Sequence, residues 1–394
     1  MILKKIILGV VVGALCAGSG VAKEVSFGGQ IRPRAEFRDP VGTGYDMFTS
    51  MRVRAQMVAK LDRNVDAFVQ IQDVRLWGEE GNTLGDFRAD NFDLHQGYVT
   101  LSNIRESNVS IRVGRQAIAF GGQRLIGAVE WTQQGRVFDG VRATMKSERV
   151  TFNAIGIRLA DATASLVHGA NAYLSGVYAT FNAAEGQSVD AYGLYNRVSG
   201  GVTDQYTLGL RWVGKSGAIS YRAEGAFQTG TRAGSDVSAF MFGVRGGTQV
   251  GKGQITLWYD YLSGDDTPGD RKTKVFDTLF ATNHKFYGFA DVFLNIPVHT
   301  GGLGLQDAAV KIGIPLNDAV KLGVDGHLFM LTKKGAASSK RLGEEIDVTL
   351  TCKYSGQVTF VSGFSFVSAK QALADIGRLN DDMKFGYVMM NVAF

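Results

Sequence analysis

The chain is poor in cysteine and proline, and beyond its N-terminus it has no long apolar segment. It contains 2 cysteines and 5 prolines among 394 residues. Cys16 lies within the N-terminal apolar stretch, so Cys352 is the only cysteine in the rest of the chain. An intramolecular disulfide is therefore excluded once that stretch is removed. A chain of this length without disulfides must be stabilised by burial or by a closed network of hydrogen bonds.

The first 22 residues have the three parts of a secretory signal peptide. Lys4 and Lys5 precede an apolar run from Ile6 to Ala17, and the small residues Gly20-Val21-Ala22 end the segment. This pattern predicts cleavage after Ala22 and export of residues 23–394 as a single domain. An N-terminal membrane anchor is the alternative, although the apolar run is short for a bilayer-spanning helix.

Strong basic charge and catalytic motifs are also lacking. Loss of the two signal lysines lowers the formal charge from +5 to +3, and no basic run is interleaved with aromatic residues, so nucleic acid is not an expected partner. The five histidines form no G-x-S-x-G, H-E-x-x-H or paired Cys/His pattern. We therefore expect no enzyme activity, no cofactor and no metal.

Glycine and aromatic residues are abundant instead: 51 Gly, 24 Phe and 13 Tyr. Mean hydropathy is near zero, and apolar and polar residues alternate with period two in segments long enough to cross a bilayer as tilted strands. We expect eighteen such strands: 24–37, 50–60, 65–75, 94–102, 109–119, 136–146, 150–160, 172–182, 189–197, 205–213, 218–228, 238–249, 254–262, 303–313, 320–331, 344–353, 358–367 and 383–394. The predicted fold is an all-β transmembrane antiparallel barrel, closed because unpaired backbone groups are not tolerated in lipid.

The predicted connections alternate in length. Short turns such as 61–64, 147–149, 214–217 and 354–357 alternate with long loops, among them 120–135, 229–237 and 263–302. Outer-membrane barrels place short turns in the periplasm and long loops outside the cell. An even number of strands then places both termini in the periplasm.

The last predicted strand, residues 383–394, ends on Phe394. A terminal phenylalanine on an amphipathic strand resembles the signal that bacterial barrel-assembly machinery recognises. Together with the expected barrel, it predicts the outer membrane of a Gram-negative bacterium, where lipid and lipopolysaccharide surround the protein.

Strand alternation predicts which side chains face the lumen. Arg32, Arg34, Arg52 and Arg54 fall on the polar face of the first two strands, with Glu36 as the only acid among them. The same alternation points Arg112, Arg142, Arg211, Arg222 and Arg245 inward. Because the guanidinium fork binds both oxygens of a carboxylate and stays charged, these residues predict an anion-preferring lumen. Wall salt bridges are the alternative role for many of them.

The stretch Ser110 to Met145 reads SIRVGRQAIAFGGQRLIGAVEWTQQGRVFDGVRATM. Its string GRQ...GGQRLIG...EW...GR.FDGVR resembles the signature of the alginate export family of outer-membrane porins. The resemblance implies an electropositive constriction that passes a linear polyuronate. By this analogy Arg32, Arg34, Arg52, Arg54, Arg112 and Arg142 would select the solute. Arg115, Arg124 and Arg136 match the motif, and their positions at strand ends make loop anchoring an equal alternative.

The long connection 263–302 also resembles that family, through SGDD and HKFYGFAD. Asp265, Asp266 and Asp270 are candidates for a cation site, but their spacing fits solvated turn residues better. His284, Phe286, Tyr287 and Asp291 predict a loop folded into the barrel mouth as a lid or plug. The expected function is passive transport of anionic saccharides or carboxylates. The alternatives are a general or substrate-specific porin for small carboxylates or oligosaccharides, and an outer-membrane receptor that binds partners by its loops.

Overall fold

The computed structural model describes residues 22–39, 46–79, 92–163, 170–200, 202–267 and 269–394. The predicted signal peptide, residues 1–22, lies outside these ranges except for Ala22. Within the described ranges, no helix combines the length and the apolar character needed to cross a bilayer.

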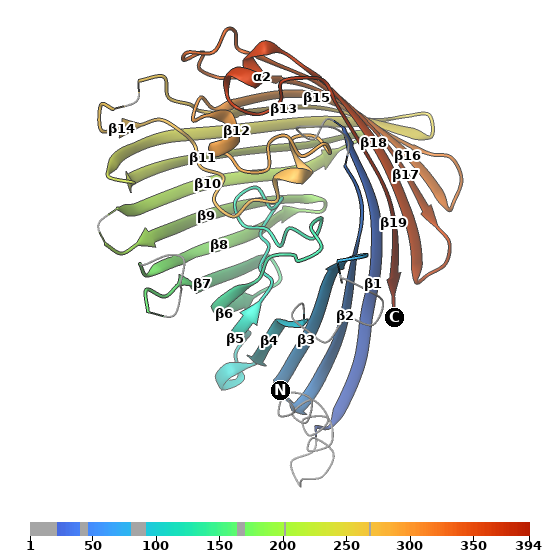
Figure 1. Ribbon diagram of the computed structural model, residues 1–394. Helices are drawn as coiled ribbons and strands as arrows, with labels where there is room; N and C mark the ends of the chain where they lie inside the picture. Colours follow the sequence, from blue (N-terminus) through green and yellow to red (C-terminus); the bar gives the residue numbers. More distant parts are fainter. Residues whose placement is uncertain (1–21, 40–45, 80–91, 164–169, 201, 268) are drawn as a thin grey trace.

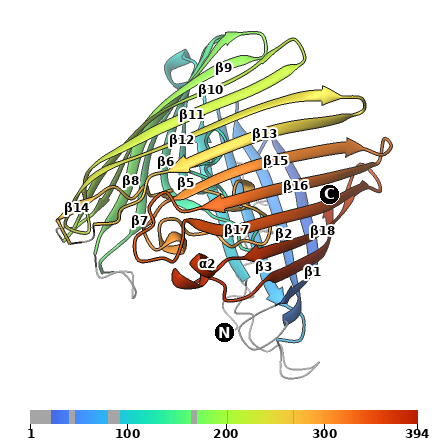
Figure 2. The same cartoon turned by 90° about the horizontal axis from the view of Figure 1, so that it is seen from above.

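A single antiparallel sheet contains eighteen long strands in the described residues (Figure 1, Figure 2). The strands are β1 (Glu24–Asp39), β2 (Asp46–Asp62), β3 (Val65–Leu76), β4 (Phe92–Leu101), β5 (Val109–Gln116), β6 (Phe138–Lys146), β7 (Val150–Ala160), β8 (Ala172–Ala184), β9 (Gln187–Val198), β10 (Thr203–Ser216), β11 (Ile219–Arg232), β12 (Ser235–Val250), β13 (Gly253–Leu262), β15 (Leu305–Pro315), β16 (Val320–Met330), β17 (Arg341–Lys353), β18 (Val358–Ala369) and β19 (Met383–Ala393).

The remaining elements are short. A two-residue strand, β14 (Lys272–Thr273), pairs in parallel with β12. Three 3-10 turns, η1 (Ile104–Glu106), η2 (Asn283–Lys285) and η3 (Val298–Thr300), and one helix, α2 (Gln371–Asp375), lie in connections.

The sheet closes on itself because β1 pairs with both β2 and β19. The β1–β19 register runs from Gln30 opposite Ala393 to Asp39 opposite Lys384. Closure removes the free strand edges that a bilayer cannot satisfy. The predicted all-β barrel of eighteen strands is confirmed.

Several predicted boundaries differ from the structure, and two of these differences change how a connection is built. The loop expected at 229–237 is a two-residue turn, because β11 continues to Arg232 and β12 starts at Ser235. Ala233 and Gly234 have φ values of 49° and 78°, the left-handed pair that a tight hairpin turn requires. The strand expected at 109–119 ends at Gln116, where the chain leaves the wall and turns into the lumen.

Alternation along β10 separates a lipid face from a lumen face. Leu208 and Leu210 are 59% and 61% exposed on the outside, whereas Gln205 and Thr207 are buried on the inside. Apolar side chains on the outer face match the hydrocarbon of a bilayer. Polar side chains on the inner face pack against two long connections inside the barrel.

Two long connections enter the barrel. We call them the first inner loop (residues 117–137) and the second inner loop (residues 263–304). The first inner loop, and the second inner loop beyond β14, lie inside the ring of strands (Figure 1). A short bridge joins them: the Phe280 amide donates to the Leu125 carbonyl at 2.8 Å, and the Gly127 amide donates to the Phe280 carbonyl at 2.8 Å. The buried apolar core lies between these loops and the wall and includes Ile118, Ile126, Phe276, Phe286, Tyr287, Phe293 and Ile296.

Candidate functional site: the lumen and its inner loops

The arginine group of β1 and β2 faces the lumen, as the alternation predicts. Arg32 and Arg52 are register partners on adjacent strands, and Arg34 and Arg54 follow on the same face. Their exposed fractions are 6% for Arg32, Arg34 and Arg54 and 1% for Arg52. These guanidinium groups are therefore covered rather than open to the lumen.

The first inner loop covers them. The loop turns its peptide carbonyls toward the wall, where no strand partner is available to donate to them, and the arginines supply the donors. Arg34 stacks on the Trp131 ring at 4.2 Å from its centroid. The main contacts are Arg32 Nη1 to the Glu130 carbonyl at 2.6 Å, Arg32 Nη2 to the Thr132 carbonyl at 2.8 Å, Arg34 Nη1 to the Trp131 carbonyl at 2.6 Å, Arg52 Nη1 to the Gln133 carbonyl at 3.1 Å and Arg54 Nη1 to the Glu130 carboxylate at 2.9 Å.

Trp131 also joins the two inner loops. Its ring stacks on His284 with centroids 4.0 Å apart, and its Nε1 donates to Asp291 at 2.8 Å. Asp291 also contacts His284 Nδ1 at 2.5 Å. The prediction that His284, Phe286, Tyr287 and Asp291 belong to a loop folded into the barrel is confirmed, since all four are buried there.

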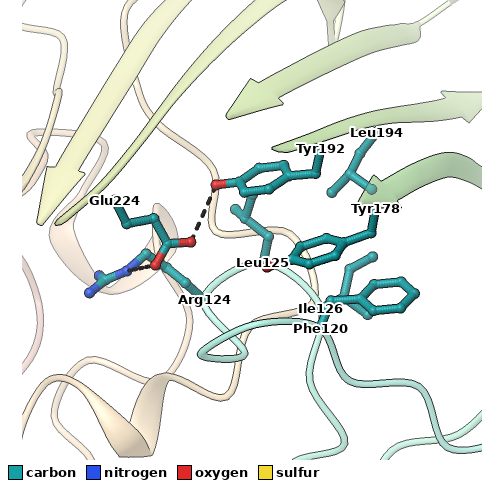
Figure 3. A pocket seen from close by; sticks show the side chains of 8 residues that line it. All are labelled: Phe120, Arg124, Leu125, Ile126, Tyr178, Tyr192, Leu194 and Glu224. Carbon is teal, nitrogen blue, oxygen red and sulfur yellow. Dashed lines mark hydrogen bonds and ion pairs between the residues drawn. The ribbon is translucent and has the colours of Figure 1, made fainter. Parts of the chain in front are cut away.

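Arg124 anchors the first inner loop to the opposite wall. Its two Nη atoms donate to the Asp260 carboxylate at 2.9 and 3.0 Å, and its Nε lies 3.4 Å from Glu224. These carboxylates raise the pKa of Arg124 despite its burial. Figure 3 shows Glu224 between Arg124 and the Tyr192 hydroxyl, at the edge of a small cavity with room for about one water molecule.

Arg136 and Arg115 hold the two ends of the same loop. Arg136 Nη1 donates to the Phe280 and Ala281 carbonyls of the second inner loop. Arg115 points away from the lumen and pairs with Asp139 at 2.8 Å. For Arg115, Arg124 and Arg136 the contacts agree with loop anchoring, which was one of the two roles expected.

Arg112 and Arg142 form a second group, as register partners on β5 and β6. Arg112 donates to the Thr100 hydroxyl at 3.2 Å and lies 4.2 Å from the Tyr98 ring centroid. Arg142 Nη2 donates to the Asn153 side-chain oxygen at 2.8 Å. All these partners are neutral, and both arginines are half-buried. Among the residues that the structure describes, neither has an ion pair.

A third group was not among the predicted selectivity residues. Arg222 and Arg245 are register partners on β11 and β12, and Lys285 of the second inner loop faces them. Arg245 packs on Trp258, 3.0 Å from the ring centroid. Burial lowers the pKa of Lys285, and the positive charges of Arg222 and Arg245 lower it further. Within the described ranges, none of these three cations forms an ion pair.

Alternation alone places Arg222 and Arg245 on the lumen face, so their sequence signal was present. Lys285 had no such signal, because it lies in an irregular loop without periodicity. Its approach to the two arginines depends on how that loop folds.

The acidic turn of the second inner loop is held by its own chain. Asp265 accepts hydrogen bonds from the Thr267 and Lys274 amides, and Asp270 accepts one from the Lys272 amide. Asp266 lies 3.4 Å from Lys333. In the described part of the chain these acids do not gather into a group able to hold a metal ion. The geometry matches the turn-residue interpretation.

Solved structures of known proteins share the fold of this chain. Pseudomonas aeruginosa OccK3 (OpdO) is 12% identical to the chain, with 95% of this chain and 97% of that chain covered and a TM-score of 0.64. Acinetobacter baumannii OccAB4 is 11% identical, with 96% and 100% covered and a TM-score of 0.65. Both are outer-membrane porins, and at this identity the likeness is one of fold. The chain has the β-barrel fold of these porins.

The sequence itself identifies the family. The model of the family described as "Alginate export" matches residues 23–355. The chain therefore belongs to the alginate export family. A search of curated protein sequences found no match.

Proposed function

We propose that this barrel is a passive porin that prefers anionic solutes, with carboxylate-bearing sugars and short uronate oligosaccharides as its solute class. The observation that carries the proposal is the set of half-buried or exposed lumen cations that form no ion pair within the described residues: Arg112, Arg142, Arg222, Arg245 and Lys285.

The partners of Arg112, Arg142 and Arg245 explain why these three cations are available to a solute. Hydroxyl, amide and aromatic groups orient a guanidinium without neutralising it. The lumen therefore keeps net positive charge near Arg112 and Arg142 on one side and near Arg222, Arg245 and Lys285 on another. Such charge attracts carboxylates and repels cations along a pore.

The inner loops limit the size of the solute. They fill the lumen between the walls with buried aromatic side chains, among them Phe286, Tyr287 and Phe293. Small carboxylates and short uronates suit this arrangement better than a polymer does. Passage of a linear polyuronate, which the family's description suggests, would require the first inner loop to leave its arginine contacts.

Export and assembly complete the proposal. Residues 1–22 act as a cleaved signal peptide, and β19 with Phe394 is the segment that the barrel-assembly machinery recognises. In the folded chain the Phe394 amide donates to the Gly29 carbonyl of β1 at 3.1 Å. N-terminal sequencing of the protein from outer-membrane fractions tests the cleavage site, which we expect after Ala22.

The test of transport is the reversal potential of the mature protein in a planar bilayer under a salt gradient. We expect anion-selective current that glucuronate and short oligouronates reduce, while neutral oligosaccharides of the same length do so less. Stronger block by long polyuronate than by short uronates would favour polymer transport. Cation-selective current, or no conductance, would contradict the proposal, and the second result would favour a receptor that binds by its loops.

A further inference from the structure

The lumen face of β15, β16 and β17 carries a second cluster of ionisable side chains, separate from the arginine groups. Strand register places Lys311, Asp325 and Asp347 side by side in one row, and His327 beside Glu345 in the next row. Because the backbone ladder fixes these positions, the five side chains share one patch of wall.

His327 is oriented by a carboxylate. Its Nδ1 lies 2.9 and 3.0 Å from the two oxygens of Asp307, and both side chains have an exposed fraction of 0%. This leaves Nε2 directed toward Asp347, whose Oδ2 is 4.0 Å away. A carboxylate that holds one imidazole nitrogen while the other faces further acids is the arrangement that orients metal-binding histidines.

Two carboxylate oxygens in the cluster are buried without a donor. Glu345 Oε2 and Asp347 Oδ2 have no hydrogen-bond partner in the described residues, although Glu345 is 0% and Asp347 is 1% exposed. Asp347 uses its other oxygen to accept the Ser365 hydroxyl at 2.5 Å. Buried polar atoms normally have partners, and two facing carboxylates repel each other. The unpartnered oxygens therefore have the negative charge and the free lone pairs that bind a cation.

We propose that His327, Asp347 and Asp325 form a binding site for one divalent cation such as zinc. One ligand atom from each of the three lies within 4.8 Å of the others. Zinc binds imidazole nitrogen and carboxylate oxygen at roughly 2.0–2.2 Å, so the side chains need to move inward by roughly 1 Å. One imidazole among carboxylates suits zinc better than magnesium or calcium, which favour oxygen ligands alone.

Lys311 competes with the metal for this binding site. Its Nζ lies 2.6 Å from Asp325 Oδ2 and 3.1 Å from His327 Nε2. The ammonium therefore occupies the binding site when no metal is bound. Lys311 and Asp325 line a cleft that also includes Lys321, Thr349 and Phe289. This cleft gives the metal a route from the lumen and gives the displaced ammonium a place to move.

The neighbouring Glu345 connects the binding site to the second inner loop. Glu345 Oε1 accepts the Ala290 amide at 2.7 Å, and Gly288 packs against the same carboxyl. A cation that neutralises Asp347 removes the repulsion on Glu345 and strengthens this contact. Metal binding is therefore expected to raise the melting temperature as well as to be measurable by itself.

The experiment is calorimetric titration of zinc chloride into the untagged mature protein, refolded in detergent and stripped with EDTA. We expect one zinc per chain. His327→Gln and Asp347→Asn are expected to weaken binding by about tenfold or more, whereas Lys311→Met should tighten it, because the competing ammonium is gone. His299→Gln, which changes a histidine of the second inner loop, is the matched control and should bind as the wild type does.

Lys311→Met separates this proposal from a folding defect, since it predicts a gain. If neither the wild type nor Lys311→Met binds zinc more tightly than Asp347→Asn, the proposal is wrong and Glu345 and Asp347 share a proton instead. Loss of binding in His299→Gln would place the zinc elsewhere and would also overturn it.

Discussion

Two pairs of arginines occupy equivalent places in this barrel and have different surroundings. Arg32 and Arg52 face each other across β1 and β2, as Arg222 and Arg245 do across β11 and β12. The first pair is covered by carbonyls of the first inner loop, whereas the second pair forms no ion pair within the described chain. An inward arginine therefore holds a loop or stays without an ion pair according to what folds against it.

We expect the two walls to have different roles. Donors that are fully engaged by a loop fix the position of that loop and hence the width of the path. In the proposed function, the cations without an ion pair set the sign of the charge that an ion meets. The following changes test this division.

The largest effect is expected from the double change Arg222→Glu and Arg245→Glu. Each unit charge acts on an ion about 4 Å away with about 1 kcal/mol in water, and reversing two charges changes four units, so the anion-to-cation permeability ratio should fall more than about tenfold. The reversal potential in a salt gradient should change sign. Arg158→Glu changes an exposed arginine at the end of β7 and is the control. An unchanged reversal potential in the double variant would remove these residues from the ion path.

The next largest effect concerns Arg52→Met, on the covered wall. Loss of this guanidinium removes the donor to the buried Gln133 carbonyl and to the Gln30 side-chain oxygen, so the free energy of unfolding should fall by about 2–4 kcal/mol. Conductance and open-channel noise should rise as the first inner loop loosens, while selectivity changes little. The exposed Arg197→Met, whose partner Asp204 is 3.8 Å away, should cost at most about 1 kcal/mol. A selectivity change as large as that of the Arg222 and Arg245 variant would contradict the division.

A smaller effect is expected from Gly288→Ala, which tests the anchor of the second inner loop. Gly288 and Gly234 have φ values of 79° and 78°, so an added Cβ strains both by about 1–2 kcal/mol. At Gly288 the Cβ would also lie 2.3 Å from Glu345 Oε2, whereas it meets nothing at Gly234. Gly288→Ala should therefore lower stability by about 1–3 kcal/mol more than Gly234→Ala. Equal losses in denaturant unfolding would mean that the loop readjusts freely.

The smallest effect is a pH dependence of selectivity. Burial and the nearby Arg222 and Arg245 lower the pKa of Lys285 below its ordinary value of 10.5. A lysine with a lowered pKa loses its charge at a lower pH than an ordinary lysine does. Anion preference should therefore begin to decline below pH 10.5 as the pH rises, and Lys285→Met should abolish this decline. A decline of equal size in Lys285→Met would assign it to another group.

Much of the barrel followed from local pattern. Period-two alternation placed the eighteen strands and pointed Arg32, Arg222 and their neighbours inward, since successive strand residues face opposite sides. Strand ends were harder to predict: alternation gave no sign that Ala233 and Gly234 close a tight turn or that the wall ends at Gln116. Turn chemistry and the inward path of a loop act outside that period.

The sequence by itself determined the class of fold, the lumen face and the chemistry available there, because a bilayer accepts only closed strands with apolar residues outside. The tertiary structure decided which of those residues are engaged. The inner loops have no periodicity, so only their packing shows that Arg34 stacks on Trp131, that Lys285 approaches Arg222 and Arg245, and that Glu345 holds Ala290. The group formed by His327, Asp325 and Asp347 likewise depends on the register of strands that are separate in the sequence.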